Sequence, residues 1–264
     1  MITRDSFAKQ YDKFAKALTR RVKAYLRDPI AENVHRLRTS TRRLQAAFAL
    51  LPKASRKQNK AQKAMASIKE LMKVSASVRD QDIILSKLST YKQNPTYERL
   101  VDDLRKARKS HLEQAKELAL SVQKNPGPRV KPKDLPEPTL QKRHDKVVRK
   151  LSSKISSELP LVREDPSKVE ELHVVRRDCK QLRYVLEMGE FSKPPKPLVA
   201  LRSWQDLLGT IRDHDVMITY LGGLKRSPEI LSALNTEIES RNNSYRKFVE
   251  VSRENPVSRF AAKL

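Results

Sequence analysis

Two short segments of this chain place a histidine and several cations at the same spacing. Residues 33–44 read NVHRLRTSTRRL, and residues 171–182 read ELHVVRRDCKQL. In each segment a cation follows the histidine by three and by seven residues, so a helix would bring the three side chains onto one face. An arginine fork binds phosphate oxygens in pairs, and imidazole can donate a hydrogen bond to phosphate whether or not it is charged. The pattern therefore predicts phosphate binding by a first stripe (His35, Arg38 and Arg42) and a second stripe (His173, Arg176 and Lys180).

Both stripes lie away from the apolar face that their helices are expected to bury. With His35 as the origin of a helical wheel, Leu37, Leu44 and Phe48 gather on the opposite side. A solvated helix face also carries lysine and arginine, but it needs no histidine at a fixed register. Because the histidine and its cationic neighbours occur twice, we favour a site over a solvated face.

A second pair of motifs carries aspartates next to an arginine. Residues 78–82 read VRDQD, and residues 211–215 read IRDHD. The two aspartates of each motif could hold Mg²⁺ together with phosphate oxygens. Residues two apart on a helix point in different directions, however, and each pair follows an arginine. We therefore favour ion pairs that orient the cations over a metal site and expect no cofactor. The aspartates in question are Asp80, Asp82, Asp213 and Asp215.

The elements that carry these motifs repeat along the chain. Five prolines in PGPRVKPKDLPEP, residues 126–138, predict a linker that no helix crosses, between a first repeat, 1–125, and a second repeat, 139–264. Amphipathic periodicity and breaks at proline and glycine predict an antiparallel four-helix bundle in each repeat. The expected helices are 5–27, 30–51, 57–90 and 95–123, then 139–159, 167–191, 197–223 and 228–254.

Two finer expectations follow from aligning the repeats. Asp28-Pro29 and Asp165-Pro166 each predict a helix start, with aspartate as the cap and proline at the first helical position. Ala76 aligns with Gly209, which predicts a position where backbones approach and only a small residue fits.

The composition indicates the fold class of the protein and the kind of partner it binds. The 264 residues include 56 Lys or Arg and 31 Asp or Glu, a formal net charge of +25, of which residues 1–130 supply +18. Charge of this size indicates a polyanionic partner. Five glycines and apolar residues at helical spacing predict an all-α fold. Cys179 is the single cysteine, so no internal disulfide can form.

The chain begins without an apolar stretch and nowhere runs eighteen apolar residues together. We therefore expect no signal peptide, no membrane contact and a cytoplasmic protein.

The doubled order of these motifs resembles the CHAD family, whose name refers to a histidine-containing α-helical domain. The resemblance rests on VHRLRTSTRRL (34–44) and LHVVRRDCKQLRY (172–184), each followed by its R-D-x-D segment, and it covers essentially the whole chain. It implies two bundles related by a pseudo-twofold axis, a basic groove between them, binding of inorganic polyphosphate and association with polyphosphate granules. At the seventh position after the histidine the second repeat has lysine where the first has arginine, so weaker phosphate binding is expected there.

The candidate binding residues comprise both stripes and basic residues aligned near them. Arg108 and Arg241 align tentatively in the fourth helices, and Lys109 and Arg246 extend the cationic face. The full set is His35, Arg38, Arg42, Arg43, Arg79, Arg108, Lys109, His173, Arg176, Lys180, Arg183, Arg212, Arg241 and Arg246. The first helix of each repeat is also basic, but charge surrounds it, so we favour a solvated face there.

Other functions fit the sequence less well. No phosphate-binding GxxxxGK[ST] loop and no cluster with two-metal spacing is present, so we expect a binding protein and not an enzyme. Nucleic acid is the main alternative partner, because phosphate contacts dominate that binding too. No helix-turn-helix, zinc or RRM signature supports it. Docking of an acidic protein segment is a third interpretation.

Overall fold

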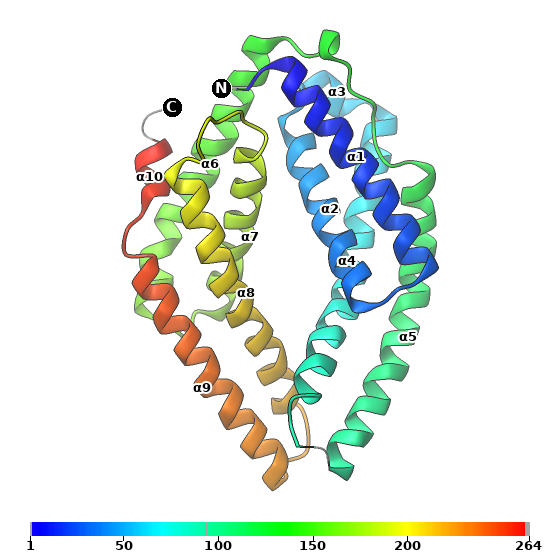
Figure 1. Cartoon of the computed structure of the whole chain (residues 1–264), viewed down its shortest axis with the longest axis vertical. Coiled ribbons are helices and arrows are strands. Elements are labelled where there is room, and N and C mark those ends of the chain that lie inside the picture. Colours follow the sequence, from blue (N-terminus) through cyan, green and yellow to red (C-terminus); the bar gives the residue numbers. More distant parts are fainter. Residues whose placement is uncertain (1, 93, 262–264) are drawn as a thin grey trace. The chain divides into compact units, whose positions relative to one another are not determined.

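The computed structural model describes residues 2–92 and 94–261 (Figure 1). Helices account for the regular structure of these residues, and no strand occurs among them, so the all-α prediction is confirmed. No helix in this described part combines the length and apolarity needed to cross a bilayer. In chain order the elements are α1 (Arg4–Arg27), α2 (Ala31–Leu50), α3 (Lys53–Lys57), α4 (Asn59–Leu88), α5 (Pro95–Lys124), the 3₁₀ turn η1 (Pro132–Asp134), α6 (Glu137–Glu164), α7 (Val169–Leu186), α8 (Lys196–Gly222), α9 (Pro228–Val251) and α10 (Pro256–Ala261).

The predicted long helices all form, and most boundaries agree within about three residues. Two ends differ. α6 continues through Pro160 to Glu164, and α7 stops at Leu186 instead of 191. Proline costs an intrahelical hydrogen bond, but the last turn of α6 is held from outside, because Val162 is buried and its carbonyl accepts a hydrogen bond of 3.0 Å from the Tyr245 hydroxyl. A tertiary contact thus outweighs the local preference.

The chain forms two compact units. One comprises the chain up to Asp82, Asp102–Lys146 and Glu187–Glu190; the other comprises Ile83–Val101, Val147–Leu186 and the chain from Phe191 onward. We call them unit 1 and unit 2. Their limits fall inside α4, α5 and α6, so units of packing differ from the repeats of sequence. The boundary between the two sequence repeats at the Pro-rich segment rests on the alignment of the motifs and stays a prediction.

In unit 1 the apolar stripe of α1 supplies much of the core. Buried residues recur at three- and four-residue spacing, as an amphipathic helix requires. α1 packs along α2, which buries Val34, Leu37 and Leu44 in return. The buried residues of α1 are Phe7, Ala8, Tyr11, Phe14, Leu18, Val22 and Tyr25. This packing leaves the other face of α1, which carries its lysines and arginines, toward solvent.

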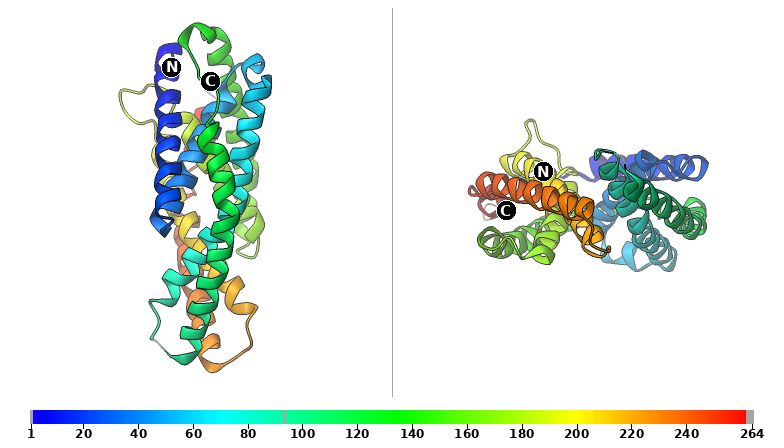
Figure 2. Two further views of the ribbon diagram at one scale, coloured as in Figure 1. Left: turned by 90° about the vertical axis from the view of Figure 1, so that its right-hand side faces the viewer. Right: turned by 90° about the horizontal axis from the view of Figure 1, so that it is seen from below.

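In unit 2 the long helix α8 packs against both α7 and α9 (Figure 2). Trp204 is buried, and its indole N–H donates to the Val251 carbonyl at 3.2 Å. The Gln205 amide donates to the Cys179 carbonyl at 2.9 Å and ties α8 to α7. Burial raises the pKa of the Cys179 thiol, which packs in the core of unit 2.

The predicted close approach of backbones at Gly209 is wrong. An ideal Cβ placed on this residue meets no atom within 4 Å, and Gly209 lies inside α8. The alignment with Ala76 therefore reflects no close approach of backbones at Gly209.

Replacing Gly209 by alanine should stabilise the protein. A glycine inside a helix costs about 1 kcal/mol relative to alanine, because glycine loses more backbone freedom on folding. We expect Gly209→Ala to raise the free energy of unfolding by about 0.5–1 kcal/mol in urea titrations. A loss of stability would show that a side chain at this position does meet an obstacle.

Candidate functional site

The first stripe divides into a buried and an exposed part. His35 is exposed, and Arg42 and Arg43 are half-buried on the same helix, α2. Arg38 is only 9% exposed, and its Nη1 donates to the Met72 carbonyl at 2.7 Å and to Ser75 Oγ at 2.8 Å. The prediction that Arg38 lies free of the packed face is therefore wrong. Arg38 ties α2 to α4, because its long side chain reaches the neighbouring helix from the edge of the apolar face.

The second stripe is half-buried along α7. His173, Arg176, Lys180 and Arg183 all retain partial contact with solvent. Tyr184 shares their side of the helical wheel but is buried, and the Arg183 guanidinium lies 4.8 Å from the centre of its ring. A stacked cation of this kind is held in place by the ring. The second stripe therefore consists of partly accessible side chains, and the buried Tyr184 ring lies beside its neighbour Arg183.

His173 is oriented by the second aspartate of its R-D-x-D motif. Its Nε2 lies 3.0 Å from Asp215 Oδ2, and the Arg241 Nε donates to the other oxygen, Oδ1, at 2.5 Å. Burial raises the pKa of Asp215, but hydrogen bonds from His173 and Arg241 outweigh it and keep that pKa below its usual value. Asp215 therefore stays ionised, and the expected ion pairing of the motif is confirmed at this position.

The same arginine also binds the turn before α7. Arg241 Nη2 donates to the Pro166 carbonyl at 3.0 Å, so one guanidinium joins α9, α8 and that turn. We call this set, Arg241, Asp215 and Pro166, the unit 2 junction. Arg241 is 7% exposed, which places it inside the protein and not on the cationic surface where the sequence analysis expected it.

Unit 1 contains a matching junction of Arg108, Asp82 and Pro29. Arg108 Nε donates to Asp82 Oδ1 at 2.7 Å, and its Nη2 donates to the Pro29 carbonyl at 2.7 Å. Burial raises the pKa of Asp82, and the Arg108 hydrogen bond offsets only part of that rise. The alignment of Arg108 with Arg241 is therefore right in position, and both side chains serve the packing within their units.

The helix starts predicted at Asp28-Pro29 and Asp165-Pro166 are wrong. α2 begins at Ala31 after Ile30, and α7 begins at Val169, so neither proline occupies the first helical position. Asp28 instead ends α1 as its C-cap. Asp165 Oδ1 accepts from the backbone N–H of Ser167 at 2.8 Å in the turn before α7. The carbonyls of Pro29 and Pro166 lie in the turns before the helices and are not part of the helical hydrogen bonding. They accept hydrogen bonds from Arg108 and Arg241 instead.

The remaining candidates lie at the surface or close to it. Arg79 and Arg212 are half-buried, while Lys109 and Arg246 are exposed. In the described part of the chain, no three His, Cys, Asp or Glu side chains are grouped so that they could hold a metal ion.

A cavity of about 740 Å³ lies between α1 and α2 in unit 1. Ser40 and Arg43 of α2 form one wall, and α1 forms the other. The basic face of α1 was expected to be solvated, because helical periodicity shows where a side chain points but not that a neighbouring helix forms a hollow there. The α1 cations that line the cavity are Lys9, Lys13, Lys16, Arg20 and Arg21.

His214 belongs to an ionic cluster that the sequence analysis left out. Glu237 Oε2 lies 2.7 Å from Lys87 Nζ and 2.5 Å from His214 Nδ1, and its Oε1 accepts from the Tyr91 hydroxyl at 2.7 Å. Burial raises the pKa of Glu237, but these hydrogen bonds outweigh it and lower the pKa to about 2 from 4.5. The cluster joins the end of α4 and the following turn to α8 and α9 within unit 2.

Glu237 should make the stability of the protein depend on acidic pH. Because its folded pKa lies below the unfolded value of 4.5, the ionised carboxylate stabilises the fold above pH 4.5. That contribution is lost as pH falls toward 2. We expect Glu237→Gln to lower the free energy of unfolding by about 2 kcal/mol at pH 7. The difference in unfolding free energy between Glu237→Gln and the unmodified protein should become smaller toward pH 2, as measured by urea titrations.

The exposed Glu239 supplies the control for this measurement. Glu239→Gln should change the unfolding free energy by less than about 0.5 kcal/mol at either pH. A Glu237→Gln difference that stayed constant between pH 7 and pH 2 would contradict the ionic role of Glu237.

Comparison with known proteins agrees with this architecture. The family model of the CHAD domain matches residues 8–222. The crystal structure of the CHAD domain from the plant Ricinus communis superposes with a TM-score of 0.63 at 17% identity, covering 100% of this chain and 92% of that one. PptA from Streptomyces chartreusis gives a TM-score of 0.57 at 14% identity, with 100% of both chains covered. At these identities the two structures establish the fold alone. No curated protein matches the sequence.

Proposed function

This chain belongs to the CHAD domain family, and we propose that it binds inorganic polyphosphate through the first and second stripes. Polyphosphate binding is a property of the family, and its assignment to these residues is our proposal. The observation that carries it is the repetition of a histidine and cations on α2 of unit 1 and α7 of unit 2. The central groove implied by the family stays a prediction.

Among the residues of both stripes and their neighbours Arg43 and Arg183, we assign phosphate contact to the side chains that reach solvent. His35, Arg42 and Arg43 serve on α2, while His173, Arg176, Lys180 and Arg183 serve on α7. Arg38, Arg108 and Arg241 act as positioning residues, because their guanidinium groups already bind backbone carbonyls. A net charge of +25 attracts any polyanion over a long range, so specificity must come from how the cations are spaced.

Competition between polyanions tests the assignment. Long-chain polyphosphate should displace duplex DNA at equal phosphate concentration and matched salt. It should also raise the melting temperature by roughly 5 °C at about 100 times its Kd, because a ligand that binds only the folded state stabilises it. Equal competition by DNA would favour a nucleic-acid-binding protein. Preference for an acidic peptide would favour a protein-docking module.

We propose that the protein binds without catalysis and accompanies polyphosphate granules. Incubation with polyphosphate, Mg²⁺ and ADP should release no phosphate, form no ATP and leave chain length unchanged. Shortened polyphosphate chains or newly formed ATP would contradict this proposal and indicate an enzyme.

A further inference from the structure

Asp215 fixes which ring nitrogen of His173 carries the hydrogen when the imidazole is neutral. The Nε2 atom lies 3.0 Å from Asp215 Oδ2, and the other carboxylate oxygen accepts a hydrogen bond from Arg241. Burial raises the pKa of Asp215, but hydrogen bonds from His173 and Arg241 outweigh burial and keep that pKa below its usual value. An ionised carboxylate can only accept hydrogen bonds, so Nε2 must be the nitrogen that carries the hydrogen.

The other ring nitrogen, Nδ1, is the atom of His173 that remains for a ligand. It has no hydrogen-bond partner among the described residues, and the side chain is 20% exposed. In the neutral ring held by Asp215, Nδ1 has a lone pair and can only accept a hydrogen bond. A phosphate oxygen is an acceptor as well, so the neutral ring cannot donate to it from Nδ1. Protonation places a hydrogen on Nδ1, and the ring can then donate to Asp215 and to phosphate together.

Unit 1 differs from unit 2 at the equivalent aspartate. Asp82 Oδ1 accepts from Arg108, as Asp215 Oδ1 accepts from Arg241. Asp82 Oδ2, however, is buried without a hydrogen-bond partner among the described residues, and His35 is exposed. Asp82 therefore does not fix the tautomer of His35, and the two histidines of the repeated motif should respond differently to pH.

The charged groups that face His173 come from its own helix and from the helices packed against it. They are Glu170 and Arg176, three residues before and after it on α7, Arg212 and Asp215 on one face of α8, and Arg241 of α9 behind Asp215. On the α6 side, Lys154 is paired with Asp178, which lies on another face of α7. A phosphate bound beside these cations offsets their charge and favours the imidazolium form of the ring. Phosphate binding and protonation of the ring should therefore accompany each other.

We propose that His173 contacts phosphate only as the imidazolium ion, so that polyphosphate binding at the second stripe takes up a proton from solvent onto Nδ1. This regulation by pH rests on the function proposed above: mild acid strengthens the binding, and alkaline pH weakens it. Asp215 acts as a positioning residue, because it bonds the ring and not the ligand. A neutral imidazole can donate to phosphate only where its tautomer is not fixed in this way.

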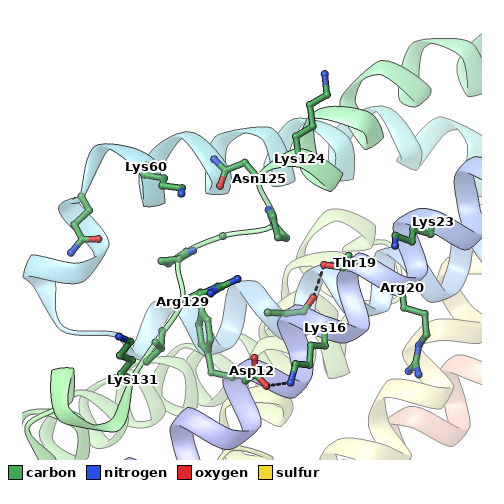
Figure 3. Close-up of a pocket in the computed structure, with 17 residues that line it drawn as sticks. Asp12, Lys16, Thr19, Arg20, Lys23, Lys60, Lys124, Asn125, Arg129 and Lys131 are labelled. Atoms are coloured by element: carbon green, nitrogen blue, oxygen red, sulfur yellow. Dashed lines mark hydrogen bonds and ion pairs between the residues drawn. The ribbon is translucent and has the colours of Figure 1, made fainter.

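The cationic cavities beside α1 should not contribute to this pH dependence. A cavity of about 1210 Å³ lies between α1 and the Pro-rich segment, and cations such as Lys124 and Arg129 line it (Figure 3). None of the described residues that line this cavity or the smaller one is a histidine. Lysine and arginine stay charged between pH 6 and pH 8, so their attraction for a polyanion is constant over this range.

Asp215→Asn tests the role of the carboxylate, because asparagine can reverse the tautomer. The amide oxygen can still accept from Arg241, while the amide N–H donates to Nε2 and leaves the ring hydrogen on Nδ1. The unmodified protein should bind long-chain polyphosphate about 10-fold more tightly at pH 6 than at pH 8. In Asp215→Asn this ratio should fall below about 3-fold. Titration calorimetry of the full chain at fixed salt measures the affinities.

Asp206→Asn supplies the matched control, since it changes the same functional group at an exposed position of the same helix. This variant should keep the ratio of about 10-fold. An unchanged ratio in Asp215→Asn, or equal binding by the unmodified protein at both pH values, would overturn the inference and leave the proposed function standing. Failure of the unmodified protein to bind polyphosphate at either pH would contradict the proposed function itself.

His173→Gln provides a second measurement that keeps the charge of Asp215. The glutamine amide can still donate to Asp215 from the place of Nε2, but it offers no donor in the place of Nδ1 and does not titrate. At pH 6 the variant should bind polyphosphate about 10-fold more weakly than the unmodified protein, with little change up to pH 8. A ratio equal to that of the unmodified protein would show that other groups take up the proton, and the inference would be wrong.

Discussion

We expect Arg42→Glu combined with Arg176→Glu to weaken binding of long-chain polyphosphate about 100-fold. One side chain lies in the first stripe and one in the second, and both are half-buried with contact to solvent. Each substitution removes a charge-assisted hydrogen bond of roughly 1.5 kcal/mol and places a negative charge beside phosphate, so the two together cost at least about 3 kcal/mol. Fluorescence titration at fixed salt measures the change.

The choice of Arg42 over Arg38 follows from burial. Arg38→Glu would place an unpaired charge against the Met72 carbonyl and unfold the contact between α2 and α4, so lost binding could not be separated from lost folding. The matched control is Lys63→Glu with Arg202→Glu, which should weaken binding less than about 5-fold while keeping the same helical circular dichroism. If both pairs weaken binding alike, only net charge matters and the stripes are not a site.

Arg241→Leu should destabilise the protein by about 3 kcal/mol. The substitution removes the guanidinium that binds Asp215 and the Pro166 carbonyl, and it leaves Asp215 buried with one donor, His173. Breaking a buried ion pair by removing one partner costs about 3–5 kcal/mol, because the remaining charge is uncompensated. Urea unfolding at pH 7 measures this loss.

Two further variants separate the ion pair from general packing. Arg246→Leu, on the exposed side of the same helix, should change stability by less than about 0.5 kcal/mol. Adding Asp215→Leu to Arg241→Leu should recover part of the loss, since the uncompensated carboxylate is then gone. Losses that simply add would show that the two side chains contribute independently.

Helix positions were predictable because they depend on local features. Leu, Ala, Lys and Glu at apolar spacing favour helices, and Pro95 and Pro228 mark starts that the structure reproduces at α5 and α9. Pro29 and Pro166 instead lie in the turns before α2 and α7. Pro160 lies inside α6, because the buried Val162 holds the last turn against the local preference.

The repeated motifs also predicted which residues take equivalent places. Arg108 and Arg241 bind Asp82 and Asp215 in the same manner, as the alignment of R-D-x-D motifs indicates. Their role was not predictable. An arginine at a helix surface binds solvent, phosphate or a neighbouring carbonyl with the same donors, and the sequence does not state which of these lies within reach.

The sequence by itself determined the helical class, the helix boundaries within a few residues and the register of the histidines with their cations. Each of these depends on residues within a few turns of one another. Only the tertiary structure decided that Arg38 and Arg241 are buried, that Gly209 faces open space, and that the basic face of α1 borders two cavities. A helical wheel gives the direction of a side chain, whereas burial and hollows depend on which distant segment packs beside it.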